Sequence, residues 1–170
     1  MNQPSAAGAM PAVRSGRAIT GMSAILLPFL ADGGIDWAAF ESHVERTAAA
    51  GLTPAVNMDT GYVQLLDAAA VSEVLDRTAA ITKGRFVAGA YVADTQGDHH
   101  DEAALLRAAL AISERGGTPV IFPSHGLRLL SDSEWVAAHA KVGSEVGRFI
   151  GFELGTMFVP YGRVVRLDTY

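Results

Sequence analysis

Apolar and polar positions alternate along the chain in blocks, each with a short apolar run followed by a stretch of helical period. The run Ile19 to Leu27 is mostly apolar without a helical period, which predicts a buried strand ending before Pro28. The turn residues Asp32 to Gly34 follow, and Asp36 is a good N-cap for a helix that ends near Gly51. The apolar residues of this helix share one face: Trp37, Phe40 and Val44.

Four further apolar runs begin about 31 to 33 residues apart, which is the length of one strand and one helix. Because these runs are almost continuously apolar, they are typical of parallel strands covered on both faces. We therefore predict strands over Leu52 to Met58, Arg85 to Val92, Thr118 to Phe122 and Phe149 to Leu154.

The segments between these runs predict helices that begin at Asp or Ser. Asp67 caps a helix that extends to Thr82, and another helix runs from about Asp101 to Arg115. Ser131 to Glu134 is a capping-box pattern for a fourth helix, after a predicted loop over Pro123 to Leu130. Repeated βα units of this kind fit either an open doubly wound sheet or part of a (β/α)8 barrel.

Composition narrows the class of protein. The 170 residues are 49% hydrophobic, enough for one ordinary core, and the formal net charge of -5 leaves no basic surface for nucleic acid. The sequence has no Cys, which fits a reducing compartment, so we expect a cytoplasmic protein. The longest apolar run, Ala24 to Ala31, is far shorter than the roughly 20 residues that span a bilayer, so we expect no membrane segment. Residues 1–17 lack the apolar region of a secretory signal and are expected to form a flexible tail.

The first three blocks also carry motifs of a known enzyme family. Met58 to Tyr62 stands where dihydrodipicolinate synthases and N-acetylneuraminate lyases have G-T-T-G-E, and Gly84 to Ala90 resembles their GR-pviaGv. Over roughly Ile19 to Gly155, the chain is similar to this family of class I pyruvate aldolases. Further matches lie at Leu27 to Phe29, Asp32, Ile35-Asp36, Gly51, Leu65-Leu66 and Glu73.

The resemblance implies a (β/α)8 barrel whose site lies at the carboxyl ends of the strands, where a sixth-strand lysine forms a Schiff base with pyruvate or a related 2-oxo acid. This sequence ends soon after the fifth predicted strand, and its only lysines, Lys83 and Lys141, are predicted away from that site. We therefore expect residues 18–170 to form a partial (β/α)8 TIM barrel of five units, with units six to eight and the lysine on a missing C-terminal segment. Its first and fifth strands would be open edges, so we expect a truncated product; closure by assembly with another chain is the alternative.

The motif after the second strand supplies the first candidate site residues. Thr60 matches the family's second threonine, whose hydroxyl binds the substrate carboxylate or joins a proton relay, and Gly61 and Tyr62 complete the substrate-binding set. Asp59 replaces the first threonine, and its charge would repel a keto acid's carboxylate, so it is a candidate catalytic residue in an altered substrate pose. The alternative is a plain turn with an Asx-type hydrogen bond.

The fourth and fifth strand ends supply the remaining candidates. Ser124 and His125 align with the tyrosines of the family's P-Y-Y, which makes Ser124 a candidate substrate contact and His125 a candidate acid or base, or an ordinary loop histidine. Glu153 is a carboxylate at the end of the fifth strand, next to Phe152 in the place of the catalytic tyrosine, and it is either a functional group there or the partner of an arginine. If the family's fifth-strand motif is instead aligned a few residues further on, Tyr161 supplies a phenol and Arg163 a cation that would bind the substrate carboxylate.

The loop Asp98 to Asp101 holds two histidines between two carboxylates, for which a solvated loop is the favoured interpretation. A divalent metal would replace the iminium only if Asp59, Glu153 and one of these histidines converged. Otherwise we expect no metal and no cofactor.

We expect the full-length protein to be a class I aldolase-like lyase acting on a 2-oxo acid, and this chain alone to be inactive. The resemblance also implies a homo-oligomer, a dimer or a tetramer, at full length. The alternatives are the metal-dependent version and an inactive barrel that serves as a binding or assembly module, with which the loss of the family's tyrosines is consistent.

Overall fold

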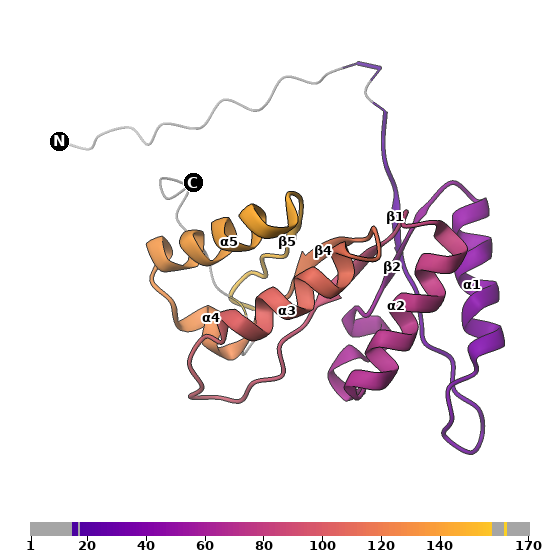
Figure 1. Cartoon of the computed structure of the whole chain (residues 1–170), viewed down its shortest axis with the longest axis horizontal. Helices are drawn as coiled ribbons and strands as arrows, with labels where there is room; N and C mark the ends of the chain where they lie inside the picture. Colours follow the sequence, from indigo (N-terminus) through magenta and orange to yellow (C-terminus); the bar gives the residue numbers. More distant parts are fainter. Residues whose placement is uncertain (1–14, 17, 158–161, 163–170) are drawn as a thin grey trace.

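The structure is a computed structural model that describes residues 15–16, 18–157 and 162. Parallel strands alternate with helices, and each strand pairs with the preceding one in the order β1-β2-β3-β4-β5 (Figure 1). Because this order never reverses along the sheet, the strands belong to a partial barrel and not to a doubly wound fold. The strands are β1 (Met22–Ala24), β2 (Thr53–Val56), β3 (Val87–Ala90), β4 (Thr118–Ile121) and β5 (Ile150–Gly151).

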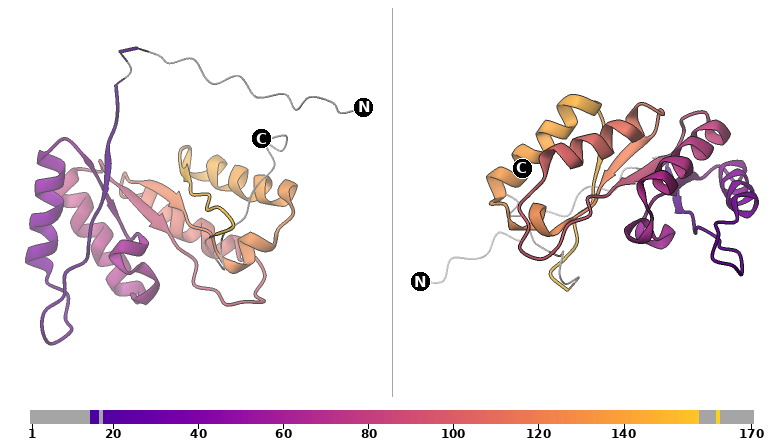
Figure 2. Two further views of the ribbon diagram at one scale, coloured as in Figure 1. Left: turned by 180° about the vertical axis from the view of Figure 1, so that it is seen from behind. Right: turned by 60° about the horizontal axis from the view of Figure 1, so that its bottom comes forward.

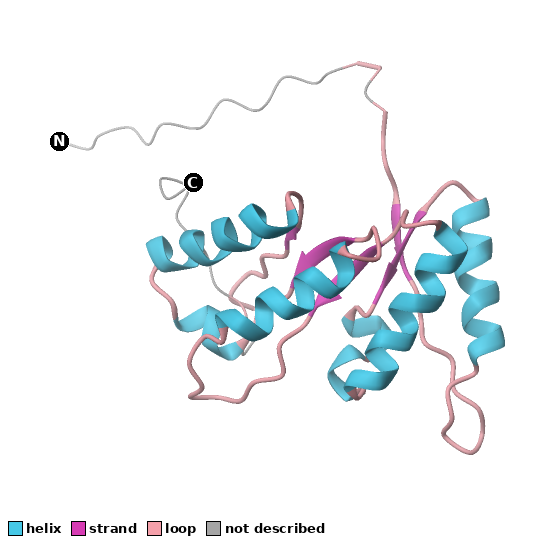
Figure 3. Ribbon diagram, in the orientation of Figure 1, coloured by secondary structure: helices cyan, strands magenta, loops and turns pink. Residues whose placement is uncertain are grey.

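Long helices connect the strands (Figure 3). The predicted N-caps are confirmed, because the carboxylates of Asp36, Asp67 and Asp101 each accept a hydrogen bond from the backbone N–H three residues further on. Ser131 and Glu134 form the predicted capping box. The long helices are α1 (Trp37–Ala49), α2 (Ala68–Thr82), α3 (Glu102–Ser113) and α5 (Asp132–Val146).

Strand side chains alternate between two sides of the curled sheet. Helices α2 and α3 lie in front of the sheet in Figure 1, and the view from behind in Figure 2 shows the strands without a helix in front of them. The helix side holds the main core, which includes Val56, Ala88 and Ile121 from the strands, Ile25 directly after β1, and Phe40, Val74 and Ile112 from the helices. The inner side holds a smaller cluster of Ala55, Val87 and Val120.

The paired strands are shorter than the apolar runs that predicted them. The first apolar run is longer than β1, which ends at Ala24. Ile25 and Leu27 lie beyond the strand and are still buried against the helices. The second strand ends at Val56 because Asn57 adopts a positive φ of 50°. The fifth strand is reduced to Ile150–Gly151. An apolar run therefore indicates which residues are buried, and buried residues continue beyond the residues that pair in the sheet.

The predicted loop over Pro123 to Leu130 is wrong, because it contains the short helix α4 (His125–Leu129). Ser124 caps this helix by accepting a hydrogen bond from the Leu127 N–H at 3.2 Å. The carboxylate of Asp94, in the loop after β3, accepts hydrogen bonds from the backbone N–H groups of His125 and Gly126 at 2.9 and 2.8 Å. A residue about thirty positions upstream thus completes the helix, which local sequence cannot reveal.

Some predictions fall on parts of the chain that the structure leaves undescribed. The tail predicted over residues 1–17 lies outside the described residues except for positions 15 and 16, and Tyr161 and Arg163 also lie outside them. Within the described part of the chain, every helix is too short or too polar to cross a bilayer.

Candidate active site

The carboxyl ends of strands β2 to β5 bring four side chains to one level. Asp59 follows β2 by three residues and Tyr91 directly follows β3, and both side chains line the same pocket. Ala90 pairs with Ile121, so Tyr91 stands opposite Phe122. By the same counting from β4 to β5, Phe122 stands opposite Phe152. In a barrel, this level is where catalytic and binding residues gather.

These four side chains line one pocket of about 580 Å³, which we call the inner pocket. Most of its lining is apolar, and among the described residues Asp59 is the one charged side chain in it. Pockets of this volume lie within the range that small ligands occupy. The full lining is Asp59, Val63, Gln64, Tyr91, Phe122, Pro123, Phe152 and Leu154.

Three aromatic rings form a continuous wall in this pocket. The ring of Phe122 meets the ring of Tyr91 edge-on, with centroids 6.5 Å apart at 83°, and meets the ring of Phe152 with centroids 5.4 Å apart at 82°. Gly89 makes room for Phe122, since a Cβ at position 89 would lie 2.3 Å from that ring and 2.2 Å from the Asn57 carbonyl oxygen. The wall therefore depends on a glycine in β3.

The predicted motif after β2 forms a 3-10 turn, η1 (Asp59–Gly61), followed by a second, η2 (Val63–Leu65). Asp59 reaches the inner pocket, whereas Thr60 is exposed and does not line it. Gly61 is buried and donates its N–H to the Met58 carbonyl at 2.9 Å. Tyr62 adopts a left-handed conformation and packs on Phe29, with ring centroids 5.9 Å apart.

Ser124 and His125 lie at the start of α4, away from the inner pocket's lining. The hydroxyl of Ser124 is occupied as the helix cap, and the His125 N–H donates to Asp94. Nearby, the backbone N–H and hydroxyl of Thr95 hold the pKa of the Asp98 carboxyl below its usual value, with a smaller contribution from the charge of His125. This corner is thus a hydrogen-bonded junction between a loop and a helix.

Glu153 lies on the helix side of the chain after β5. It lines two hollows there together with Trp135 and His139. Its neighbour Phe152 lines one of these hollows and also the inner pocket, which Glu153 does not line. Glu153 and Asp59 therefore line different hollows. Among the described residues, no three His, Asp or Glu side chains gather to hold a metal ion, so the convergence needed for the metal-dependent alternative does not occur there.

Sequence reasoning missed Tyr91 and Phe122. Each lies at the end of a predicted strand, an even number of residues after the inward-facing Val87 or Val120. Counting by twos from those positions would have placed both side chains on the inner side.

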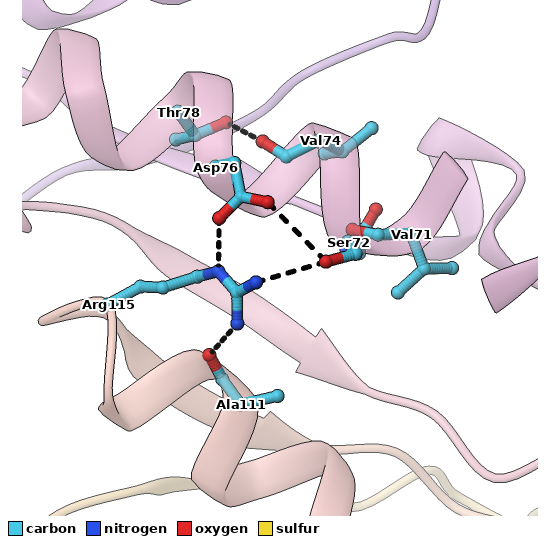
Figure 4. Close-up of polar contacts among 8 residues, drawn as sticks. Val71, Ser72, Val74, Asp76, Thr78, Ala111 and Arg115 are labelled. Carbon is cyan, nitrogen blue, oxygen red and sulfur yellow. Dashed lines mark hydrogen bonds and ion pairs between the residues drawn. The ribbon is translucent and has the colours of Figure 1, made fainter. Parts of the chain in front are cut away.

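A second hollow of about 350 Å³ separates α2 from α3 and shares the lining residues Val63, Gln64 and Tyr91 with the inner pocket. Arg115 bridges the two helices at this hollow, donating from Nε to Asp76 at 2.7 Å and from Nη2 to Ser72 at 3.0 Å (Figure 4). The same guanidinium donates to the Ala111 carbonyl at 2.8 Å. The hydrogen bond from Arg115 holds the pKa of Asp76 below its usual value, and Asp76 raises the pKa of Arg115.

The strand order, the curl and the site at the carboxyl ends define the class of fold: the first five units of a (β/α)8 barrel. Solved structures share this fold. A putative dihydrodipicolinate synthetase from Pseudomonas aeruginosa superposes with a TM-score of 0.71 at 22% identity, over 89% of this chain and 51% of that chain.

Dihydrodipicolinate synthase from Bacillus clausii superposes with a TM-score of 0.62 at 18% identity, over 85% of this chain and 46% of that chain. The chloride-inhibited enzyme from Acinetobacter baumannii, complexed with pyruvate, gives a TM-score of 0.63 at 18% identity, over 81% of this chain and 46% of that chain. No family model and no curated protein matches the sequence. The similarity predicted from the motifs is therefore confirmed for the fold, and the chain spans about half the length of the solved structures that it matches.

Proposed function

We propose that this chain forms the first five units of a class I aldolase-type lyase acting on a 2-oxo acid, with the Schiff-base lysine on a sixth strand beyond this sequence. The observation that carries the proposal is the inner pocket at the carboxyl ends of β2 to β5, in a fold shared with dihydrodipicolinate synthases. One of the similar structures is a complex with pyruvate, which supports a 2-oxo acid as the ligand class.

Tyr91 and Asp59 are the groups of this chain that we propose for proton transfer. Phe152 stands where the motif alignment places the family's catalytic tyrosine, and a phenylalanine cannot transfer protons. Tyr91, directly after β3, brings a phenol to the same pocket on the far side of Phe122 from Phe152, and Asp59 lines that pocket too. A phenol and a carboxylate facing one ligand can exchange a proton with it.

The other predicted residues keep supporting roles in this proposal. Thr60 follows Asp59 on the same turn and would bind a ligand that extends out of the pocket. Tyr161 and Arg163 stay candidates for a second phenol and for binding the substrate carboxylate. We assign no step to His125 or Glu153, because neither lines the inner pocket.

The test needs a sixth strand. We would join this chain to units six to eight of a dihydrodipicolinate synthase that carries the lysine, add pyruvate and borohydride, and follow adduct formation by intact mass. The 170-residue chain alone serves as a control, since Lys83 is the C-cap of α2 and Lys141 lies in α5. We expect an adduct only in the joined protein.

Because the lysine comes from the added half, the decisive comparison is between variants of this chain. Tyr91→Phe and Asp59→Asn should each slow aldol turnover by about 100-fold, as expected for loss of an acid or base. Asp98→Asn, in the loop outside the pocket, is the matched control and should leave turnover unchanged. Two results would contradict the proposal. One is a folded joined protein that forms no adduct, and the other is an aldol turnover rate that neither pocket substitution changes.

A binding or assembly module is the second candidate function. It is favoured by one observation: Phe152 and Phe122 pack edge-on where the family places a proton-transferring phenol. Under this alternative the joined protein would bind no 2-oxo acid, and Tyr91→Phe would have no effect on any turnover.

A further inference from the structure

The side chains of the inner pocket indicate a ligand class more specifically than the position of the pocket in the barrel does. Its three rings come from three successive strands at one level, and each adjacent pair meets edge-on. Edge-to-face contact is the arrangement that aromatic rings prefer, and a further ring can extend it. The wall is therefore a ready contact surface for an aromatic ligand.

The wall is held in place by the backbone beneath it. Phe122 is nearly buried, with 9% of its surface exposed, and its ring occupies the space that a side chain at Gly89 would need. Tyr91 and Phe152 flank it and remain half-buried, so both have surface left for a ligand. A ligand ring would meet a preformed surface and would lose little free energy to rearrangement of the protein.

Charge decides which aromatic ligands fit. In the part of the lining that the structure describes, Asp59 is the one charged side chain, and it is exposed on the turn after β2. A ligand carboxylate beside it would be repelled, whereas a hydroxyl group could donate a hydrogen bond to it. The pocket thus combines an aromatic wall with an acceptor that disfavours anions.

We infer that the inner pocket binds an uncharged aromatic group bearing a hydroxyl that donates to Asp59, so that the second substrate of the proposed lyase is a hydroxyl-bearing aromatic aldehyde. This inference rests on the proposed function for its chemistry, but ring binding by the pocket needs no lysine. The 2-oxo acid would lie outside the wall, toward the strands that this sequence does not include.

Ring binding can be measured on the 170-residue chain itself. We would titrate it with 4-fluorobenzyl alcohol and with 4-fluorobenzoate and follow fluorine NMR line widths, since an alcohol cannot form imines with the lysines. The alcohol should bind about tenfold more tightly than the benzoate, because Asp59 repels the carboxylate. Asp59→Asn should bring the two affinities close together.

Two substitutions of the same type locate the binding. Phe152→Leu should weaken binding of the alcohol by about threefold to tenfold through loss of one ring contact. Phe149→Leu is the control, because Phe149 lies near His139 on the helix side, with ring centroids 5.9 Å apart. Circular dichroism of each variant establishes that it is folded.

Three results would overturn the inference: no binding of the alcohol, equal binding of alcohol and benzoate, or equal effects of Phe152→Leu and Phe149→Leu. Failure of the lyase proposal has a different signature, namely no borohydride adduct in the joined protein while the alcohol still binds this chain. The two proposals can therefore fail separately.

Discussion

Arg115 should be a measurable part of the stability of the half-barrel, because it bridges α2 and α3 across the hollow between them. Arg115→Met keeps most of the aliphatic stem and removes the hydrogen bonds to Asp76, Ser72 and the Ala111 carbonyl. The Arg115 and Asp76 side chains are 25% and 55% exposed, so solvent screens their attraction and the ion pair contributes about 0.5 kcal/mol. The two remaining hydrogen bonds add about 0.5 kcal/mol each, at the low end for partly exposed groups.

We therefore expect Arg115→Met to lower the free energy of unfolding by about 1.5 kcal/mol at neutral pH. Urea denaturation followed by circular dichroism measures this, and a double-mutant cycle with Asp76→Asn isolates the ion pair. Arg107→Met, on α3 without a described bridge to α2, is the matched control. A loss below about 0.3 kcal/mol, or a loss equal to that of the control, would refute the bridging role.

The same pair predicts a pH dependence with a definite sign. The pKa of Asp76 is lowered in the folded protein, so its contribution to stability is present above the unfolded pKa of about 3.9 and is lost as pH falls through the folded pKa. The coupling energy between Arg115 and Asp76 should thus be constant from pH 5 to 7 and should vanish in more acidic solution. A coupling that grew on acidification would contradict this assignment.

Three further predictions concern elements that hold the site. Phe40→Ala, at a side chain only 1% exposed, should cost about 3 to 5 kcal/mol in urea denaturation, with Glu45→Ala as the surface control. Ser131→Ala should cost about 0.5 to 2 kcal/mol through loss of the α5 cap, and Ser131→Thr should restore most of it. Asp94→Ala should speed hydrogen exchange at the His125 and Gly126 amides at least about tenfold, because both lose their acceptor; unchanged exchange would show that α4 holds without it.

Most of the fold could be predicted from the order of apolar and polar residues. The five apolar runs are strands, and the helix starts at Asp36, Asp67, Asp101 and Ser131 were right because a cap is a local interaction over three residues. The family motifs also pointed correctly to a partial barrel. Strand lengths were overestimated, since apolar residues such as Ile25 and Leu27 serve the helix interface as well as the sheet.

The composition of the site was decided by tertiary structure. Asp59 could be proposed from its place after β2, but its partners in the pocket, Tyr91 and Phe122, belong to other strands and are set by the inter-strand register. Glu153 and Phe152 are neighbours in sequence just after β5, yet Phe152 lines the inner pocket and Glu153 lines only the helix-side hollows. Sequence alone thus determined which segments form strands and helices, through local propensity and capping. The tertiary structure decided which side chains share a pocket. That depends on how the strands pair and on the side of the sheet each residue faces, and the pairing is made between segments more than thirty residues apart.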